Sequence, residues 1–304
     1  MLVEAEQLIT FAVVAKYGSL SEAAKHLFKS QPAVSAQLKK LQESVGEPLY
    51  KRHRYGVILT PCGETLLPYA QALTRSLEGA RQYARELKDG HSGHLRVAAS
   101  TTIAMYYLPR YLKQFADEHA GLDLQLLTCN TQEAIALLRD GSADLAMIEG
   151  PDAALELAHL VVAEDELILA VLPEHPLADK TRVEPGDVDG LPVVRRELGS
   201  GTRAVVDSAL AAHGVELRSI LEAKGVDAVK EAILQGFGAG FISRLAVERE
   251  CAVGLLKALP IGAAGLKRPL SILHPGLELC SQTTRRFIGF MEAEAEGRGS
   301  GARA

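Results

Sequence analysis

Three short runs of small polar residues have the chemistry to bind an anion. Each follows a predicted strand or directly precedes a predicted helix, where free backbone N–H groups and a partial positive charge favour negative ligands. The glycines of the third run let backbone N–H groups come close to a ligand. The candidate ligand-binding residues are Ser100, Thr101, Thr102, Asn130, Thr131, Gly199, Ser200, Gly201 and Thr202.

Two interpretations of these runs are open. Taken singly, each run is more often an ordinary capped helix, because Ser and Thr are common N-caps. Three such loops at the carboxyl ends of strands favour a shared cleft. We expect the ligand to be a small carboxylate, phosphate or inorganic oxyanion, and tight binding of only neutral or cationic molecules would contradict this expectation.

Enzyme motifs do not occur here at the spacing that they require. Residues 199–201 lack the spacing of a nucleophile elbow. The glycine-rich residues 236–240 precede a predicted strand, whereas a dinucleotide fingerprint follows a strand and opens a helix. The 4 cysteines include no close pair, which argues against both a zinc site and a disulfide framework. The sequence therefore predicts no catalytic residue, no metal and no cofactor.

A second set of side chains, within residues 31–54, is suited to contacting DNA. Gln31 suits adenine, the small Ser35 admits a base edge, and Lys39 reaches phosphates. Arg52 and Arg54 lie in a basic stretch that would follow the phosphate backbone if residues 49–59 form a β-hairpin wing. A solvated basic loop is the alternative for that stretch.

Short amphipathic helices would position the first of these side chains. Ser19 and Glu22 form a capping box at the start of one helix, and Pro32 lies in the first turn of the next. Apolar residues recur at helical spacing in both, and also in a helix upstream: Leu8, Phe11, Ala12 and Ala15, then Leu20, Ala23, Ala24 and Leu27, then Val34, Leu38, Leu41 and Val45. The pattern predicts a helix-turn-helix, with an ordinary helical hairpin as the alternative.

A long helix is predicted across residues 61–89, with Thr60 as its cap. Its apolar residues alternate spacings of four and three, which is typical of a coiled-coil seam between two subunits. An amphipathic helix folded onto its own domain is the alternative. The predicted dimerisation residues are Leu66, Ala70, Leu73, Leu77, Ala80, Ala84 and Leu87.

From residue 93 onward, predicted strands alternate with predicted helices, which is typical of an α/β domain with helices on both faces of a sheet. Strands are expected at residues 95–99, 122–127, 144–148, 166–172, 192–194, 240–242 and 269–274. Helices are expected at residues 108–118, 132–140, 203–213 and 226–235. Residues 90–94 form the expected hinge, and residues 292–304 an expected disordered tail.

Several motifs, taken together, resemble the family of LysR-type transcriptional regulators. They are residues 18–27 (GSLSEAAKHL), 30–35 (SQPAVS), 59–64 (LTPCGE) and 138–146 (LRDGSADLA). Residues 100–103 (STTI) and 196–203 (RELGSGTR) are similar to the branch that contains the CbbR-type and related metabolic regulators.

The resemblance implies three parts: a winged helix-turn-helix at residues 1–60, a dimerising linker helix at 61–89 and an α/β effector-binding domain at 90–291. The effector domain would have two lobes of the periplasmic-binding-protein type, with the effector between them. Lobe I would comprise residues 93–164 and 266–291, and lobe II residues 165–265.

The resemblance also implies roles and partners. It assigns base or phosphate contact to Gln31, Pro32, Ala33 and Ser35, with Ser30 at the cap of the same helix, and Arg52 matches the wing arginine. The expected partners are double-stranded promoter DNA, a small anionic effector, further copies of the chain in dimers and tetramers, and RNA polymerase.

Four places depart from the family pattern. Lys29 stands where an apolar residue is usual, Ala36 where a basic residue is common, and Cys62 where alanine is usual. Loss of a basic side chain at position 36 would weaken one DNA contact, and Lys29 would replace that charge only if it faces DNA. Residues 224–226 lack the usual hydroxyl or amide groups, and Lys224 would favour an acidic effector only if it faces the cleft.

Charge is distributed unevenly along the chain, whose net charge is −5. Residues 1–62 hold 8 Lys or Arg and 5 Asp or Glu, a net charge of +3, which leaves 25 and 33, a net charge of −8, for the remainder. A module this weakly basic binds DNA modestly, so we expect affinity to come from dimerisation and several half-sites, with marked salt sensitivity.

The chain has neither a signal-peptide pattern nor an 18-residue apolar run, so we expect a cytoplasmic protein with no membrane partner. The predicted function is effector-modulated promoter binding. The alternative is a cytoplasmic metabolite-sensing protein whose helix-turn-helix mediates protein contacts. Loss of specific DNA binding on changing Gln31 and Ser35 would separate the two functions.

Overall fold

The computed structural model describes residues 2–54, 56–89, 93–150 and 157–301. The chain divides into two compact units, with the main division in the sequence near residue 90. Among the described residues, no helix combines the length and apolarity that a membrane span requires.

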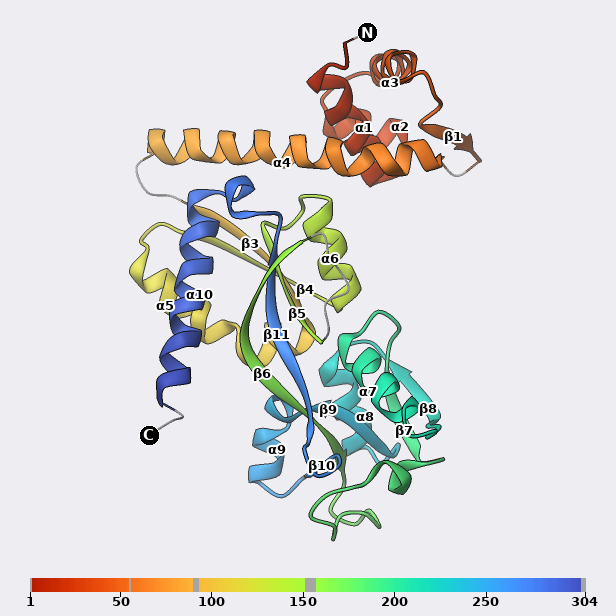
Figure 1. Cartoon of the computed structure of the whole chain (residues 1–304), viewed down its shortest axis with the longest axis vertical. Coiled ribbons are helices and arrows are strands. Elements are labelled where there is room, and N and C mark those ends of the chain that lie inside the picture. The colour runs from red at the N-terminus through yellow and green to blue at the C-terminus, as the bar shows by residue number, and fades with distance from the viewer. Residues whose placement is uncertain (1, 55, 90–92, 151–156, 302–304) are drawn as a thin grey trace. The chain divides into compact units, whose positions relative to one another are not determined.

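The N-terminal unit is a winged helix-turn-helix followed by a long helix (Figure 1). Ser19 and Ser30 cap the second and third helices by accepting hydrogen bonds from the backbone N–H groups of Glu22 and Ala33. The predicted capping box at Ser19 is only half formed, because the Glu22 carboxylate pairs with Lys25 instead. The elements are α1 (Ala5–Tyr17), α2 (Leu20–His26), α3 (Gln31–Val45), β1 (Tyr50–His53), β2 (Gly56–Leu59) and α4 (Pro61–Asp89).

The first turns of α4 pack into the core of this unit. Phe11, Val34 and Leu38 are fully buried, and Ala70 of α4 joins the same cluster with Leu66 packed against it. Leu66 and Ala70, predicted to form a seam between subunits, therefore belong to the core of their own chain. The heptad pattern could not distinguish packing within the chain from packing between subunits, because both kinds of apolar face have the same spacing.

The C-terminal unit is built on one nine-stranded sheet with the order β4-β3-β5-β11-β6-β9-β7-β8, in which β10 pairs with β6. Two parallel groups, β4-β3-β5 and β9-β7-β8, flank the antiparallel pair β11 and β6. The strands are β3 (His94–Ser100), β4 (Asp123–Cys129), β5 (Leu145–Glu149), β6 (Ala158–Val171), β7 (Pro192–Arg196), β8 (Arg218–Ala223), β9 (Ala239–Ser243), β10 (Lys257–Pro260) and β11 (Leu266–His274).

Helices pack on these two groups and make two lobes, which the long strands β6 and β11 connect (Figure 1). The first lobe contains β3, β4 and β5, and the second contains β7, β8, β9 and β10. The first lobe carries α5 (Pro109–Glu118), α6 (Thr131–Arg139) and α10 (Gln282–Gly301), and the second α7 (Gly201–Ala211), α8 (Val226–Leu234) and α9 (Glu248–Ala252).

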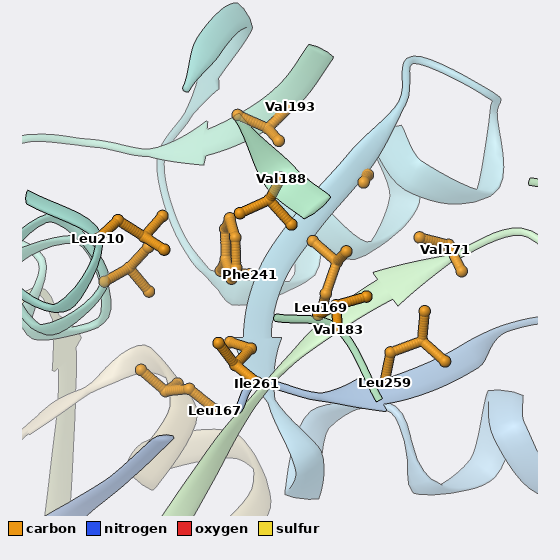
Figure 2. Close-up of a cluster of buried hydrophobic side chains, with 12 residues drawn as sticks. Leu167, Leu169, Val171, Val183, Val188, Val193, Leu210, Phe241, Leu259 and Ile261 are labelled. Atoms are coloured by element: carbon orange, nitrogen blue, oxygen red, sulfur yellow. The ribbon is translucent and has the colours of Figure 1, made fainter. Parts of the chain in front are cut away.

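Each lobe has its own apolar core. In the first, side chains of β3 and α6 such as Ala98 and Ile135 pack together. In the second, Leu169 and Phe241 lie at the centre of a cluster that Leu210 of α7 helps to close (Figure 2). Because each core is separate, the lobes are joined mainly by strands and by the polar residues between them.

The structure confirms the predicted α/β architecture and differs from the sequence prediction in several places, among them the helices α9 and α10, which were not predicted. Strands β8 and β10 were not predicted, and β6 begins at Ala158 rather than at residue 166, so the expected lobe boundary at 164/165 falls inside a strand. The expected disordered tail was wrong over residues 292–301, because α10 continues to Gly301, and residues 302–304 lie outside the described part. Glu and Ala in this segment favour continuation of a helix that is already packed.

Candidate functional site

The first candidate site is the exposed face of α3. Val34, Leu38 and Leu41 are fully buried, so this helix turns its opposite face outward. On that face Ser35 is half-buried, and the other predicted contacts of the helix are exposed: Ser30, Gln31, Pro32, Ala33 and Lys39. The local pattern thus separates a packing face from a face whose side chains are exposed to solvent.

The wing is attached to this helix through a predicted contact residue. The hairpin pairs Arg52 with Val57, and the Arg52 guanidinium donates a hydrogen bond of 3.0 Å to the hydroxyl of Ser35. Arg54 follows β1 and is exposed. The bond fixes the basic hairpin beside α3, so both elements present their polar groups together.

Lys29 does not supply the charge that is missing at position 36. Its ammonium group donates to a carboxylate oxygen of Glu6 at 2.7 Å and to the amide oxygen of Gln37 at 3.0 Å. An ion pair with α1 therefore neutralises Lys29, and Ala36 leaves an exposed position on α3 without a cation.

The second candidate site lies between the two lobes of the C-terminal unit, and the structure brings the three predicted polar runs together there. The N–H of Gly201 donates to the Thr131 hydroxyl at 3.1 Å, and the N–H of Gln132 donates to the Gly199 carbonyl at 3.1 Å. The N–H of Val226, the first residue of α8, donates to the Thr101 hydroxyl at 3.2 Å. Loops far apart in sequence thus converge on the N-termini of α6, α7 and α8.

Glycine is required where α7 approaches the first lobe. A Cβ on Gly201 would lie 2.2 Å from the Glu149 carbonyl oxygen and 2.7 Å from the Thr131 hydroxyl. Gly199 has a φ of +84°, a backbone conformation that L side chains rarely adopt. These two glycines let the N-terminus of α7 come against the end of β5.

A group of buried charged residues at this junction was not predicted from the sequence. Arg268 of β11 is fully buried and donates to Asp165 of β6 at 2.8 Å and to the Thr202 hydroxyl at 2.8 Å. Glu149, at the end of β5, accepts a hydrogen bond from the Ser100 hydroxyl. The available signal was a charged residue within or ending an otherwise apolar strand, since such residues are rarely buried without a partner.

Arg196 and Glu197 form a second buried pair in the same region. The guanidinium and carboxylate make two hydrogen bonds, of 2.8 and 3.0 Å, and the carboxylate also accepts from the N–H of Gly225 at 3.2 Å. Burial raises the pKa of Glu197, but the bond to Arg196 and its charge outweigh this and hold that pKa below its usual value. The start of α8 therefore already has a carboxylate of the chain beside it.

Besides Nε of Arg203 and Nη2 of Arg268, which lies 2.7 Å from a carboxylate oxygen of Asp165, four buried polar atoms at the junction have no hydrogen-bond partner among the described residues. They are the hydroxyl oxygens of Thr102 and Ser200, one guanidinium nitrogen (Nη1) of Arg196 and one carboxylate oxygen (Oε1) of Glu149. A buried polar group without a partner costs about 1–3 kcal/mol, so each of these atoms calls for a ligand atom or a water. Three of the four can donate to an anion.

Lys224, whose direction the sequence left open, is mostly exposed and forms an ion pair of 2.6 Å with Glu133 of α6. It therefore connects the lobes at the rim. Among the described residues, no cluster of three His, Cys, Asp or Glu side chains is arranged to hold a metal ion.

A tyrosine forms another contact between the lobes. Tyr106, in the π-helical turn Ile103–Tyr107, donates to Asp227 of α8 and accepts from Lys230 at 2.8 Å. Lys230 is in turn 2.9 Å from a carboxylate oxygen of Glu250. Burial, and then the bond to Asp227, raise the pKa of Tyr106, so its hydroxyl keeps its proton at neutral pH.

We expect Tyr106→Phe to lower the stability of the C-terminal unit by about 1–3 kcal/mol, because Lys230 loses an acceptor and Asp227 a donor. Chemical denaturation of the full chain measures this effect. Tyr69→Phe, which alters an exposed tyrosine of α4, is the matched control and should change stability by less than about 0.5 kcal/mol. Equal stability of the two variants would refute a structural role for the contact.

Comparison with known proteins agrees with both units. The LysR substrate binding domain matches residues 88–296, and the bacterial regulatory helix-turn-helix protein of the lysR family matches residues 5–64. The chain is 30% identical over 292 residues to a RuBisCO operon transcriptional regulator of Acidithiobacillus ferrooxidans, covering 96% of this chain and 94% of that protein.

Two solved structures share the fold. A full-length OxyR variant of Pseudomonas aeruginosa has a TM-score of 0.73 at 20% identity, covering 97% of this chain and 95% of that one. The CcmR regulatory domain of Synechocystis, in complex with 2-PG, has a TM-score of 0.62 at 27% identity, covering 66% of this chain and 97% of that one. With both of its domains matched, the chain belongs to the LysR family of bacterial transcriptional regulators.

Proposed function

We propose that α3 is the recognition helix and that it places Gln31 and Ser35 at base edges in the major groove. The observation that carries this proposal is the contact between Arg52 and Ser35, which holds the basic wing beside the exposed face of α3. Gln31, Pro32 and Ala33 lie in the first turn of the helix, where side chains of helix-turn-helix proteins reach bases. Lys39 and Arg54 contact phosphates in this arrangement.

The effector in this proposal is a small anion held between the lobes. Its support is the set of unpartnered buried donors on Thr102, Ser200 and Arg196, together with the N-terminus of α7. The related CcmR regulatory domain was solved in complex with 2-PG, a small ligand in a domain that is 27% identical to this chain. An isothermal titration with inorganic phosphate measures whether the cleft takes an anion.

The effector acts by favouring one arrangement of the lobes, which changes the spacing or angle of paired DNA-binding units. Equal effector affinity with and without operator DNA would contradict this coupling.

We place the subunit seam on α4 beyond the core residues, at Leu73, Leu77, Ala80 and Ala84; Leu87 lies where side chains are not described. Sedimentation of the full chain measures whether it forms dimers or tetramers.

The proposal also includes a contact with RNA polymerase and a location in the cytoplasm. Bacterial promoters are located in the cytoplasm, and a regulator bound beside one can contact the polymerase there. Co-purification of polymerase with the chain on promoter DNA, compared with the same DNA alone, tests the contact.

The DNA proposal is tested by fluorescence anisotropy with DNA from upstream of the chain's own gene and a scrambled duplex, at several salt concentrations. We expect a preference of about tenfold or more for the upstream DNA, persisting as salt rises. Replacing Gln31 and Ser35 with alanine should remove this preference, because the base contacts and the anchor of Arg52 are both lost.

Ser76→Ala, on an exposed position of α4, is the matched control and should bind as the wild type does. Salt-sensitive binding of equal strength to both duplexes would count against upstream DNA as the operator. A preference that survives in the double variant would refute the assignment of Gln31 and Ser35.

A further inference from the structure

Glu149 adds a negative group to an anion site. Its side chain is about 1% exposed, one carboxylate oxygen (Oε2) accepts from the Ser100 hydroxyl, and the other (Oε1) has no hydrogen-bond partner. The nearest cationic atom recorded for Oε1 is Nη1 of Arg268, at 3.5 Å. A carboxylate oxygen only accepts hydrogen bonds, so a bare anion oxygen placed against it would be repelled.

Two arginines lie near Glu149, but both make their shortest contacts with other carboxylates. Arg268 from β11 makes its short contacts with Asp165 of β6, and Arg196 from β7 makes its own with Glu197. The two guanidinium groups are thus used by two other carboxylates, which leaves Glu149 as the excess negative charge of the cluster. Burial raises the pKa of Glu149 against the pull of Arg268 and Arg196, which is the direction expected for a carboxylate without its own counter-ion.

The unpartnered donors nearby and the unpartnered acceptor Oε1 together describe a ligand with two kinds of group. Negative oxygens would accept hydrogen bonds from Thr102, Ser200 and Arg196, while one hydroxyl would donate to Glu149. An anion that carries no proton can satisfy the first set only, and it leaves two oxygens in contact with no hydrogen between them.

We propose that Glu149 makes the cleft selective for anions that bring their own hydroxyl, either a hydrogen oxyanion or a hydroxylated organic acid, whose O–H donates to Oε1. This inference rests on the anionic effector proposed above and assigns its chemical class. Thr102, Ser200 and Arg196 hold the charged end, and Glu149 selects for the hydroxyl.

Phosphate and sulfate provide the sharpest test, because they have the same shape and nearly the same size. At pH 8 hydrogen phosphate still carries a proton, whereas sulfate carries none. We expect isothermal titration of the full chain to give about tenfold or greater preference for phosphate, since a site built to receive a hydroxyl rejects the analogue that lacks it. Glycerate and propionate form a second pair, which separates a hydroxylated acid from a hydrogen oxyanion as the source of the hydroxyl.

Glu149→Gln should reduce the preference to about onefold, because the amide N–H₂ can donate to sulfate. Glu164→Gln, at a mostly exposed carboxylate of β6 that pairs with Lys267, is the matched control and should keep the preference. The wild type alone gives an independent readout: in buffers of different ionisation enthalpy at pH 8, sulfate binding should take up about one proton, and phosphate binding none.

Each outcome decides a different claim. If the wild type prefers one anion within either pair and Glu149→Gln removes that preference, the inference is supported. The pair that shows the preference then identifies the source of the hydroxyl. Equal affinities within both pairs, or a preference unchanged in Glu149→Gln, overturn the role of Glu149 but leave the anion site standing. If none of the four anions binds the wild type, the anionic effector itself is refuted, and this inference with it.

Discussion

Replacing Arg268 with methionine is expected to destabilise the C-terminal unit by about 3–5 kcal/mol, the cost of removing one partner from a buried ion pair. Arg268 is the cation closest to both Asp165 and Glu149, and it also donates to Thr202 of the second lobe. Methionine fills much of the same volume. The loss would therefore arise mainly from Asp165, which is left without its cation, and from Glu149, which loses the nearest positive charge.

The destabilisation should grow as pH rises. The pKa of Glu149 is raised in the folded chain by burial, and Arg268 works against that rise. Because an acid with a raised folded pKa makes folding less favourable as pH increases towards that pKa, removing Arg268 extends the penalty to higher pH. Urea denaturation should accordingly give a larger difference from the wild type at pH 8 than at pH 5.

Arg249→Met is the matched control, because Arg249 of α9 is exposed, and its effect should stay within about 0.5 kcal/mol. Combining Arg268→Met with Asp165→Leu should recover part of the loss, since one uncompensated charge is then removed as well. A loss below about 1 kcal/mol at both pH values would mean that water already solvates these carboxylates.

The N-terminal unit could be predicted closely because its signals are local. Ser19 and Ser30 are strong caps, and the apolar spacing of α2 and α3 separates a buried face from an exposed one without any tertiary knowledge. The heptads of α4 were equally clear as a helix. The surface that these apolar residues pack against could not be predicted. Ala70 packs in its own domain, and spacing does not distinguish intramolecular from intermolecular contact.

In the cleft, the polar loop residues could be predicted from the sequence, but the buried charged residues could not. Its hydroxyl and glycine residues lie at the ends of strands, where position in the sequence already indicates a loop beside a helix N-terminus. Glu149 and Arg268 gave only a weaker signal, a charged residue in or ending an apolar strand. Their partners are distant in sequence and are brought to them by β6 and β11, which run between the lobes. Strand β8 was missed for a related reason: its residues are largely exposed, so its apolar pattern is weak.

Gly201→Ala is expected to destabilise the C-terminal unit by about 1–3 kcal/mol, the usual cost of overpacking a tight contact. The added Cβ would lie 2.2 Å from the Glu149 carbonyl oxygen, which is backbone and cannot rotate away. Helix α7 would have to withdraw, and its hydrogen bond from Gly201 to Thr131 would break. Since the N-terminus of α7 forms part of the proposed site, phosphate affinity should fall by about tenfold or more.

Gly289→Ala makes the same chemical change in α10, where the new methyl group meets nothing within 4 Å. In an exposed helix interior alanine is favoured over glycine by about 1 kcal/mol, so this control should be slightly more stable than the wild type. If Gly201→Ala lowers stability while Gly289→Ala raises it, the loss in Gly201→Ala comes from the close approach of α7 to β5. If Gly201→Ala were as stable as Gly289→Ala and bound phosphate normally, the lobes would not need this contact, and the anion would have to be held without the N-terminus of α7.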